Sequence, residues 1–352
     1  MRVFVTGGAG FIGSAFCRVA VKSGWSILNF DKLTYAGNLA SLSEISTSAG
    51  YSFVRGDICD QKIVSNLLND FQPDAIAHFA AESHVDRSIT GSAAFIQTNI
   101  CGTHSMLEAA LSYWRTLSTQ GQKAFRFLHV STDEVFGSLD ETGCFSETTP
   151  YDPRSPYSAS KAGSDHLVSA WRHTYGLPTI VSNCSNNYGP YQFPEKLIPL
   201  ITLNALEGRA LPVYGDGKNV RDWLFVDDHV SALMLMIERG AAGETYCVGG
   251  RSERSNIDVV RTICSIVDQE APSPSIGNRE SLIEFVTDRP GHDRRYAIDP
   301  TKIERELGWS SLQTFETGVA RSIKWYLTRR DWWEPIRSGV YKGERLGIGE
   351  SR

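Results

Sequence analysis

Residues 157–161 read Tyr-Ser-Ala-Ser-Lys and lie in a helical stretch that begins at Pro156. Side chains four residues apart lie on one face of a helix, so Tyr157 and Lys161 can face the same pocket. A phenol has an ordinary pKa of about 10 and is a poor base at neutral pH, whereas a nearby ammonium favours the phenolate. A lone Tyr-x-x-x-Lys pattern is typical of an ordinary amphipathic helix, so a catalytic interpretation depends on other motifs.

The segment 6–13 reads Thr-Gly-Gly-Ala-Gly-Phe-Ile-Gly and lies between a predicted strand and a predicted helix. Gly7 or Gly8, followed by Gly10 and Gly13, gives both G-x-x-G-x-x-G and G-x-G-x-x-G. A Cβ here would strain the turn, block its approach to a pyrophosphate or push the helix from the strand. The helix start then offers N–H groups to phosphates. This context predicts a dinucleotide site rather than a plain tight turn.

Two acidic residues follow the second and third predicted strands. Asp31 lies 18 residues after Gly13. A carboxylate there accepts hydrogen bonds from ribose hydroxyls and repels a 2′-phosphate, which favours NAD over NADP. Asp57 is predicted to reach the adenine, and it can also be the N-cap of a helix that begins near Gln61.

The segment 131–134, Ser-Thr-Asp-Glu, follows another predicted strand. Adjacent acids at a strand end are most often solvated or cap a turn. In a desolvated site, however, neighbouring carboxylates repel, so one holds its proton while the other stays ionised. Asp133 and Glu134 are therefore predicted to divide acid and base work beside Tyr157 and Lys161.

The elements that must position these motifs alternate along the first half of the chain. Nearly apolar strands separated by helices imply a parallel sheet covered on both faces, which binds ligands beyond the carboxyl ends of its strands. The predicted fold is therefore α/β, with a Rossmann-type doubly wound parallel sheet and a smaller mixed α/β C-terminal domain. The predicted strands are Arg2–Thr6, Ser26–Phe30, Tyr51–Arg55, Ala75–Phe79, Phe127–Ser131 and Thr179–Asn183.

The composition changes in the segment 186–194, which is rich in Asn, Pro and Gly. The dinucleotide-binding domain is predicted to span 1–190, with 222–250 returning to it. The substrate-binding domain is predicted to comprise 191–221 and 251–335, followed by a tail at 336–352.

The composition excludes several classes of protein. Of the 352 residues, 41% are hydrophobic and 21% are charged, which is the balance of a soluble globular protein. The net charge of −5 argues against nucleic acid as the main partner. No run of about 20 apolar residues indicates a membrane span, and glycine at position 7 comes too soon for a signal peptide, so a cytosolic protein is expected. The seven cysteines and eight histidines show no metal-ligand or disulfide spacing.

With these motifs together, the chain resembles the dTDP-glucose 4,6-dehydratase family of extended short-chain dehydrogenases/reductases. One departure is Phe136, where this family usually has Tyr, so a polar role at that position is absent here. The strings that carry the resemblance span nearly the whole chain and are 31–39, 80–88, 131–135, 184–190, 219–223, 288–296 and 343–347.

The resemblance implies tightly bound NAD and the substrate dTDP-glucose. In the implied reaction, Tyr157 removes the C4 hydroxyl proton of the sugar while NAD takes the C4 hydride, and Thr132 holds the C4 oxygen. Glu134 then removes the C5 proton, and Asp133 protonates the C6 hydroxyl, which leaves as water. The hydride returns to C6 and C5 is reprotonated, so the cofactor ends as it began.

The resemblance also implies two sets of contacts. Arg221 and Arg289 suit a diphosphate, and Tyr214 can stack on thymine; the alternative for each is an ion pair or packing contact between domains. His84 either binds substrate or satisfies a loop. The cofactor set is Gly7, Gly10, Phe11, Ile12, Gly13, Asp31, Lys32, Leu33, Thr34, Asp57, Ile58, Ala80, Ala81, Ser83, Thr98, Ser131, Tyr157, Lys161 and Asn187. The substrate set is His84, Thr132, Asn186, Glu195, Lys196, Leu197, Pro212, Val213, Tyr214, Arg221, Asn256, Asp288, Arg289 and His292.

Other interpretations stay open from the sequence. A nucleotide-sugar 4-epimerase shares the glycine turn, Tyr157 and Lys161, but has no use for an acid–base pair at 133–134. A 4,6-dehydratase for another nucleotide and a non-catalytic NAD-binding module are the remaining alternatives. The family resemblance also implies a homodimer joined through Ser92–Trp114 and Tyr157–Tyr175, and a product that feeds rhamnose or another deoxysugar. Trp325, Trp332 and Trp333 are expected to pack.

Overall fold

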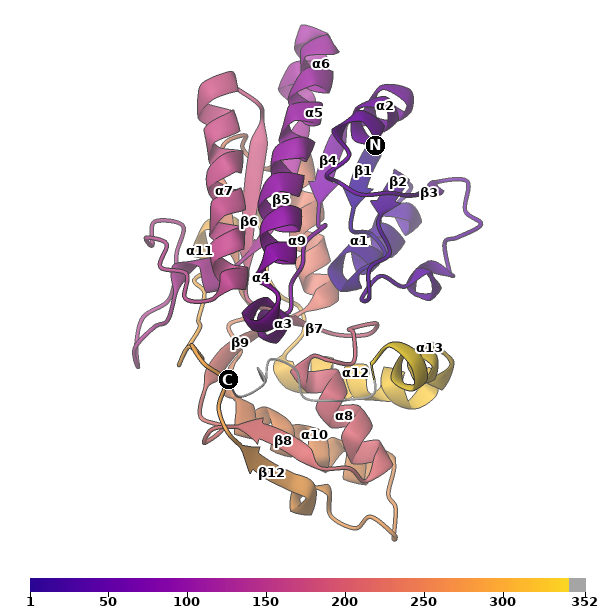
Figure 1. Cartoon of the computed structure of the whole chain (residues 1–352), viewed down its shortest axis with the longest axis vertical. Helices are drawn as coiled ribbons and strands as arrows, with labels where there is room; N and C mark the ends of the chain where they lie inside the picture. The colour runs from indigo at the N-terminus through magenta and orange to yellow at the C-terminus, as the bar shows by residue number, and fades with distance from the viewer. Residues whose placement is uncertain (342–352) are drawn as a thin grey trace.

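A computed structural model describes residues 1–341, and the resemblance string 343–347 lies outside the described residues. Its main element is a seven-stranded parallel sheet with the order β10-β6-β5-β4-β1-β2-β3 (Figure 1). The predicted α/β fold with a Rossmann-type sheet is confirmed. The strands of this sheet are β1 (Arg2–Thr6), β2 (Ser26–Asp31), β3 (Tyr51–Arg55), β4 (Ala75–His78), β5 (Arg126–Thr132), β6 (Thr179–Cys184) and β10 (Thr245–Val248).

The predicted strands agree with the observed ones to within a residue at each end. The differences matter at β5, which continues through Thr132 rather than ending at Ser131. Thr132 is therefore part of the sheet, and the acids at 133 and 134 begin the turn beyond it.

Helices cover both faces of the sheet, because successive strand residues point to opposite sides. In β1, Val3 and Val5 pack into one apolar cluster and Phe4 into the other. The Phe4 side is covered by α2 (Gln61–Phe71), α5 (Thr103–Thr116) and α7 (Pro156–Tyr175). The opposite side is covered by α1 (Phe11–Lys22), α9 (Val226–Arg239) and α11 (Thr301–Leu307).

The predicted helix at 92–114 is a longer run of three parts. It contains α4 (Ser92–Phe95), the π-helical segment η2 (Ile96–Gly102) and α5, which ends at Thr116. The helix α3 (Val85–Thr90) precedes it and α6 (Thr119–Ala124) follows it. A π segment within a helix is frequently found at functional sites.

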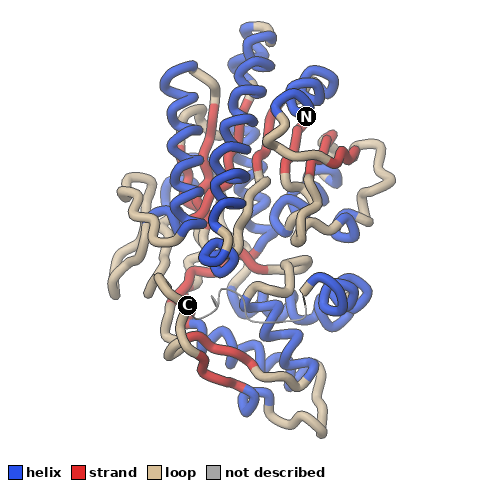
Figure 2. Tube along the Cα trace, viewed as in Figure 1, coloured by secondary structure: helices blue, strands red, loops and turns tan. Residues whose placement is uncertain are grey.

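A second, smaller region lies beyond the carboxyl ends of β1, β4 and β5 (Figures 1 and 2). It holds a three-stranded sheet of the order β11-β9-β7 and a two-stranded sheet of β12 and β8. Its strands are β7 (Asn186–Tyr188), β8 (Leu211–Tyr214), β9 (Val220–Phe225), β11 (Glu253–Ser255) and β12 (Ile283–Val286). Its helices are α8 (Leu197–Glu207), α10 (Asn256–Glu270), α12 (Phe315–Thr328) and α13 (Arg330–Pro335). Four more short helical segments lie within residues 1–341: η1 (Leu39–Leu42), η3 (Asp133–Phe136), η4 (Arg279–Leu282) and η5 (Ile336–Val340).

The chain crosses between the two regions more than once. The strand β9 belongs to the small sheet, whereas α9 covers the large sheet and β10 is its edge strand. The domain limits stated above stay a prediction. The tryptophans Trp332 and Trp333 are buried, and the indole N–H of Trp332 donates to Ser41 Oγ at 3.0 Å.

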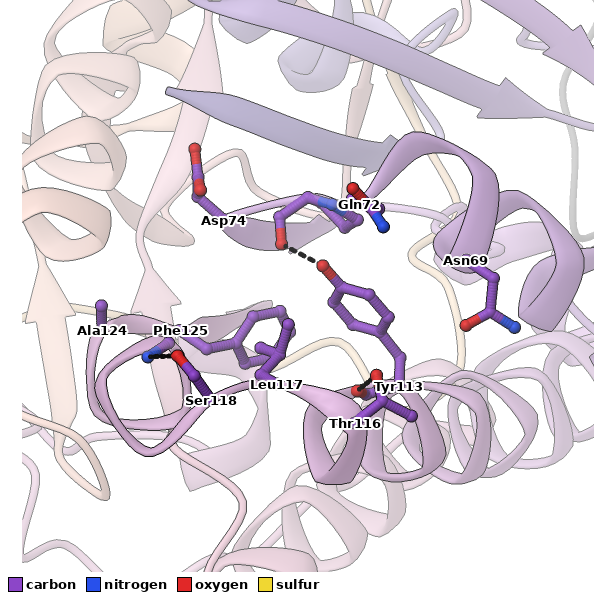
Figure 3. Close-up of a pocket in the computed structure, with 11 residues that line it drawn as sticks. Asn69, Gln72, Asp74, Tyr113, Thr116, Leu117, Ser118, Ala124 and Phe125 are labelled. Atoms are coloured by element: carbon purple, nitrogen blue, oxygen red, sulfur yellow. Dashed lines mark hydrogen bonds between the residues drawn. The ribbon is translucent and has the colours of Figure 1, made fainter.

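One hollow lies at the amino ends of β4 and β5, at the opposite edge of the sheet from the predicted site (Figure 3). Its lining includes Gln72, Asp74 and Tyr113, and the Tyr113 hydroxyl donates to the carbonyl oxygen of Pro73 at 3.0 Å. None of the predicted site residues line it. Among residues 1–341, no helix is long and apolar enough to cross a bilayer, and no three His, Cys, Asp or Glu side chains gather as a metal site.

Candidate active site

The glycine turn joins β1 to α1 at the carboxyl edge of the sheet. Gly7 has a φ of +71°, and a Cβ on it would lie 2.6 Å from the backbone nitrogen of Ala80. Only glycine therefore fits the place where the ends of β1 and β4 come together. Gly10 is the N-cap of α1 and provides no side-chain cap, so the first turn, which contains Phe11, Ile12 and Gly13, directs N–H groups beyond the sheet.

Asp31 ends β2 beside this turn. Its Oδ2 accepts a hydrogen bond from the backbone N–H of Ala9 at 2.9 Å, and its Oδ1 accepts one from Leu33 at 2.7 Å. Burial raises the pKa of Asp31, while these two N–H groups lower it. Lys32 and Thr34 are exposed on the loop that follows.

Asp57 and Lys32 come together at the end of β3, with 2.7 Å between Asp57 Oδ2 and Lys32 Nζ. Asp57 also accepts the N–H of Cys59 at 2.9 Å. The N-cap of α2 is Asp60, so the prediction that Asp57 could cap this helix is wrong. The N-cap is the residue directly before the helix, and Asp57 lies three residues before that position. Ile58 is buried between them.

The loop after β4 carries Ala80, Ala81 and Ser83 past the glycine turn. The N–H of Ala80 donates to Thr6 Oγ1 at 3.2 Å, which ties this loop to the end of β1. Thr98 is half-buried on the π segment η2.

Asn99, next to Thr98, connects that loop to α7. Its Oδ1 accepts the N–H of Glu82 at 2.8 Å, and its Nδ2 donates to the Glu82 carbonyl at 3.0 Å. The same Nδ2 donates to Ser160 Oγ at 2.8 Å. Because Ser160 lies between Tyr157 and Lys161 on α7, Asn99 fixes α7 relative to the loop that carries the predicted cofactor residues Ala80, Ala81 and Ser83.

The predicted acid and base stand in the turn η3, directly after β5. Thr132 Oγ1 accepts the N–H of Glu134 at 3.2 Å and caps this turn, and it lies 3.2 Å from Asp133 Oδ1. The Asp133 Oδ2 atom is buried without a hydrogen-bond partner among the described residues. Burial, and then the charge of Glu134, raise the pKa of Asp133 well above its ordinary value. This environment favours a protonated carboxyl with a free oxygen.

Glu134 has different neighbours from Asp133. Burial raises its pKa, but the positive charges of Arg289, Arg221 and Lys196 lower it. A carboxylate surrounded by three cations holds its negative charge more readily than one without them. On balance both pKa values are raised, that of Asp133 well above its ordinary value, so Asp133 keeps its proton more readily than Glu134, as an acid–base pair requires.

Tyr157 and Lys161 lie on α7, which has a capping box at Ser155 and proline at its first position. The Lys161 ammonium donates to the Val130 carbonyl at 2.9 Å, below the site. Burial, and then Glu134, raise the pKa of Tyr157 well above its ordinary value, while a hydrogen bond to Thr132 lowers it. Burial and the nearby acids therefore favour the protonated phenol, and the role of Tyr157 as the base stays a prediction.

Two arginines face the acids from the second region. Arg289 Nη1 donates to Asp86 Oδ1 at 3.0 Å, and its Nε is buried without a partner among the described residues. Arg221 donates to the Asp293 carbonyl at 3.0 Å and stacks over the Tyr296 ring with its guanidinium carbon 4.1 Å from the centroid. Both guanidinium groups are held at the mouth of the site, close enough to Glu134 to lower its pKa.

Asp86 also accepts the Tyr214 hydroxyl at 3.2 Å, so one carboxylate holds both an arginine and an aromatic ring of the predicted substrate set. His292 Nδ1 lies 2.6 Å from Asp288 Oδ1, and burial lowers the pKa of His292 to about 4. The ring of His292 meets that of Tyr214 edge-on at 6.3 Å.

The side chains of Glu195 and Lys196, in the second region, contact loops and helices at the edge of the large sheet. The Glu195 carboxylate accepts hydrogen bonds from the Tyr35 hydroxyl and from Arg87 Nε, each at 3.0 Å. Both of its oxygens are thus bound within the protein. Lys196 Nζ donates to the Ser83 carbonyl at 3.0 Å. Burial lowers the pKa of His84 to about 2, and its Nδ1 has no hydrogen-bond partner in the described chain.

The other predicted substrate and cofactor residues differ in whether their side chains already have partners within the protein. Asn186 Oδ1 is buried without a partner in the part of the chain described. Asn187, by contrast, contacts His229 Nδ1 at 2.9 Å and donates to the Ser185 carbonyl at 3.0 Å. Val213 belongs to the apolar core of the second region. Leu197 packs against the same core, Pro212 is half-buried on β8, and Asn256 begins α10.

The chain is similar to known proteins over nearly its whole length. The family model for GDP-mannose 4,6 dehydratase matches residues 4–322. A probable dTDP-glucose 4,6-dehydratase of Sinorhizobium fredii is 58% identical over 350 residues, which is 99% of each chain. The chain belongs to the dTDP-glucose 4,6-dehydratase family.

Solved structures of this family have the same fold. The dTDP-glucose 4,6-dehydratase of Bacillus anthracis, in complex with NAD, is 44% identical with a TM-score of 0.85, covering 96% of this chain and 99% of that one. DesIV of Streptomyces venezuelae, a dTDP-glucose 4,6-dehydratase with NAD bound, is 45% identical with a TM-score of 0.88, covering 96% and 100%. The predicted family resemblance is confirmed.

Within this family member, Phe136 packs against Phe145 and edge-on against Tyr151, with ring centroids 5.2 Å apart in both pairs. Sequence reasoning missed Asn99 and Asp86, which hold other site residues in place. Asn99 lies in the predicted helix 92–114, and Asp86 lies in the segment 80–88, which supports the family resemblance. Their partners, however, are 61 and 203 residues away along the chain.

Proposed function

We propose that this protein removes water from dTDP-glucose and gives dTDP-4-keto-6-deoxy-glucose. The observation that supports this most is the pair Asp133 and Glu134, which lies in the η3 turn beside Tyr157 with surroundings that separate their pKa values. An enzyme that only moved hydride to and from C4 would need the tyrosine but not two adjacent acids.

The cofactor that fits the first half of the site is NAD. The uncapped start of α1 and the close approach of Gly7 to Ala80 form a cradle for a pyrophosphate, because a side chain there would fill it. Asp31, at the end of β2, suits the adenosine ribose, and its charge disfavours NADP. When bound, NAD accepts the C4 hydride and returns it to C6.

The side chains of this protein carry the proton transfers. Tyr157 takes the proton of the C4 hydroxyl, and the positive charges of Lys161 and the bound nicotinamide offset the burial that raises its pKa. Glu134 takes the C5 proton, which the new C4 ketone has made acidic. Asp133 gives its proton to the C6 oxygen, which leaves as water. C5 regains a proton when hydride is added at C6.

The second region supplies the substrate contacts. Arg221 and Arg289 present guanidinium groups suited to a diphosphate. Arg289 Nε has no partner within residues 1–341, which leaves one donor for it. Asn186 Oδ1 is a second group without a partner in that part of the chain. Tyr214, fixed by Asp86, offers a ring face for thymine.

The direct test mixes the purified protein with dTDP-, UDP- and GDP-glucose and follows the products by mass. We expect loss of water from dTDP-glucose, a 4-keto product and no net release of NADH. If only UDP- or GDP-glucose loses water, the nucleobase in the proposed substrate is wrong. If none of the three loses water, the proposal is rejected.

The variant Glu134→Gln distinguishes a dehydratase from a 4-epimerase. Without the C5 base, water loss should fall by about 10²-fold or more, while oxidation at C4 still occurs and reduced cofactor accumulates. Transient absorbance of the reduced nicotinamide measures this step. In an epimerase the same change should have little effect on turnover.

We also propose a cytoplasmic homodimer that contributes to dTDP-rhamnose or another deoxysugar. The helices α5 and α7 lie side by side on one face of the sheet, where two copies can pair through 92–114 and 157–175 (Figure 1). Sedimentation velocity measures the oligomeric state, and a monomer at micromolar concentration would reject this part.

A further inference from the structure

A buried carboxylate that the proposed reaction does not use lies on α7, one turn beyond Lys161. Asp165 is 3% exposed. Its Oδ2 accepts hydrogen bonds from Ser131 Oγ at 2.7 Å, Tyr151 OH at 2.9 Å and Asn183 Nδ2 at 3.2 Å. Three donors on one oxygen favour the ionised form. A negative charge is thus held in the interior, below the floor of the active site.

His129 on β5 lies between this carboxylate and the lysine. Its Nε2 is 3.1 Å from Asp165 Oδ1 and 3.5 Å from Lys161 Nζ. Burial lowers the pKa of His129 to about 4, so the imidazole is neutral at neutral pH. It cannot then be the counter-ion of Asp165.

A buried charge needs a partner of opposite sign, since leaving it unpaired is costly. Lys161 is 4% exposed, and burial lowers its pKa while the charge of Asp165 raises it. We propose that Asp165 is a positioning residue that acts through Lys161, as the buried counter-ion that keeps the ammonium charged from the other side of His129.

The other titratable groups around the pair do not supply this charge. His78 on β4 faces Lys161, and burial lowers its pKa well below the ordinary value. Cys184 on β6 faces both Lys161 and Tyr157, and burial raises the pKa of its thiol. Asp133 and Glu134 act on Tyr157 from η3, on the substrate side. Asp165 is the acid whose charge raises the pKa of Lys161, from the side of the lysine away from the substrate.

The test rests on the proposed function, because it follows the first step on dTDP-glucose. In single-turnover experiments with Asp165→Asn, the rate of cofactor reduction is measured across pH. We expect a fall of about tenfold near neutral pH. We also expect the alkaline limb to move to lower pH by about one unit, because Lys161 loses its proton more easily without the anion.

Tyr151→Phe is the matched control, because it removes one hydrogen bond to the same carboxylate and leaves its charge. It should keep the wild-type pH profile, and Asp165→Glu should restore the alkaline limb. In a Lys161→Met background, Asp165→Asn should cause no further change. If Asp165→Asn does not fold, Asp165→Ser replaces it in the same assay.

A charge-removing variant with a wild-type pH profile would overturn the inference, and so would an equal shift in Tyr151→Phe. Failure of the proposed function looks different, because the wild-type protein itself would then not convert dTDP-glucose. In that case the pH dependence of NAD binding, measured on wild type and Asp165→Asn, still tests whether the charge of Lys161 depends on Asp165. Identical profiles there would reject the inference.

Discussion

Asp133 and Glu134 are neighbours in the chain, yet their surroundings differ in kind. Asp133 is 1% exposed, with one oxygen against Thr132 and the other without a partner among the described residues. Glu134 faces the cations Arg289, Arg221 and Lys196. The strand-to-turn transition after Thr132 produces this separation, because it turns two successive side chains toward different neighbours. The proposed proton donor and proton acceptor thereby come from one turn.

Asp133→Asn keeps the size of the side chain and removes its proton. We expect dehydration to fall by about 10²–10⁴-fold while cofactor reduction at C4 continues. Since the pKa of Asp133 is raised, the acid is present below that pKa and is lost as pH rises through it. The wild-type elimination step should therefore slow at high pH, measured by product mass after rapid quench. The exposed Asp140→Asn is the control, and near-normal dehydration by Asp133→Asn would assign the acid elsewhere.

At the scale of the element, the two glycines Gly7 and Gly10 of the glycine turn differ in the room that they leave for a side chain. Gly7 has no room for a Cβ, whereas Gly10 has an ordinary φ of −77° and its nearest neighbour would be 3.3 Å away. Gly10→Ala should therefore fold but place a methyl group where a pyrophosphate approaches.

For Gly10→Ala we expect NAD affinity to fall about 10–100-fold, with a change in unfolding free energy of about 1 kcal/mol or less. Isothermal titration and thermal unfolding measure the two quantities. Gly121→Ala is a matched control, since its Cβ would also meet its nearest atom at 3.3 Å but lies in α6, away from the site. Unchanged NAD affinity in Gly10→Ala would show that the pyrophosphate does not bind at this turn.

The sequence predicts well what short stretches of chain decide. The strands β1 and β3, the extent of α7 and the glycine turn follow from local periodicity and steric requirements, and the structure has them as expected. The cap of α2 was missed because Asp57 and Asp60 both precede the helix, and only the backbone path selects Asp60. The contacts of Asp86 and Asn99, and the burial that raises the pKa of Tyr157, depend on residues distant in sequence that no local pattern reveals.

At the scale of the whole molecule, polar contacts across the site are among those that join the two regions. Asp86 on α3 holds Arg289 and Tyr214 of the second region. Glu195 of the second region binds Tyr35 and Arg87 of the first, and the Arg87 guanidinium carbon lies 4.0 Å from the centroid of the Tyr35 ring. Tyr35 lies on the loop that follows Asp31, so this contact joins the cofactor side of the site to the substrate side.

This geometry changes the interpretation of Glu195, which the family resemblance places against the substrate. Because Tyr35 and Arg87 occupy its two oxygens, we expect it to hold the regions together. Tyr35→Phe and Glu195→Gln should then both raise KM for dTDP-glucose by about tenfold, with less than additive effects when combined. Each should also lower the unfolding free energy by about 1–3 kcal/mol. Steady-state kinetics and thermal unfolding provide the measurements, with Tyr51→Phe on β3 as the control. If Glu195 instead touches the sugar nucleotide directly, only Glu195→Gln will raise KM, and Tyr35→Phe will behave like the control.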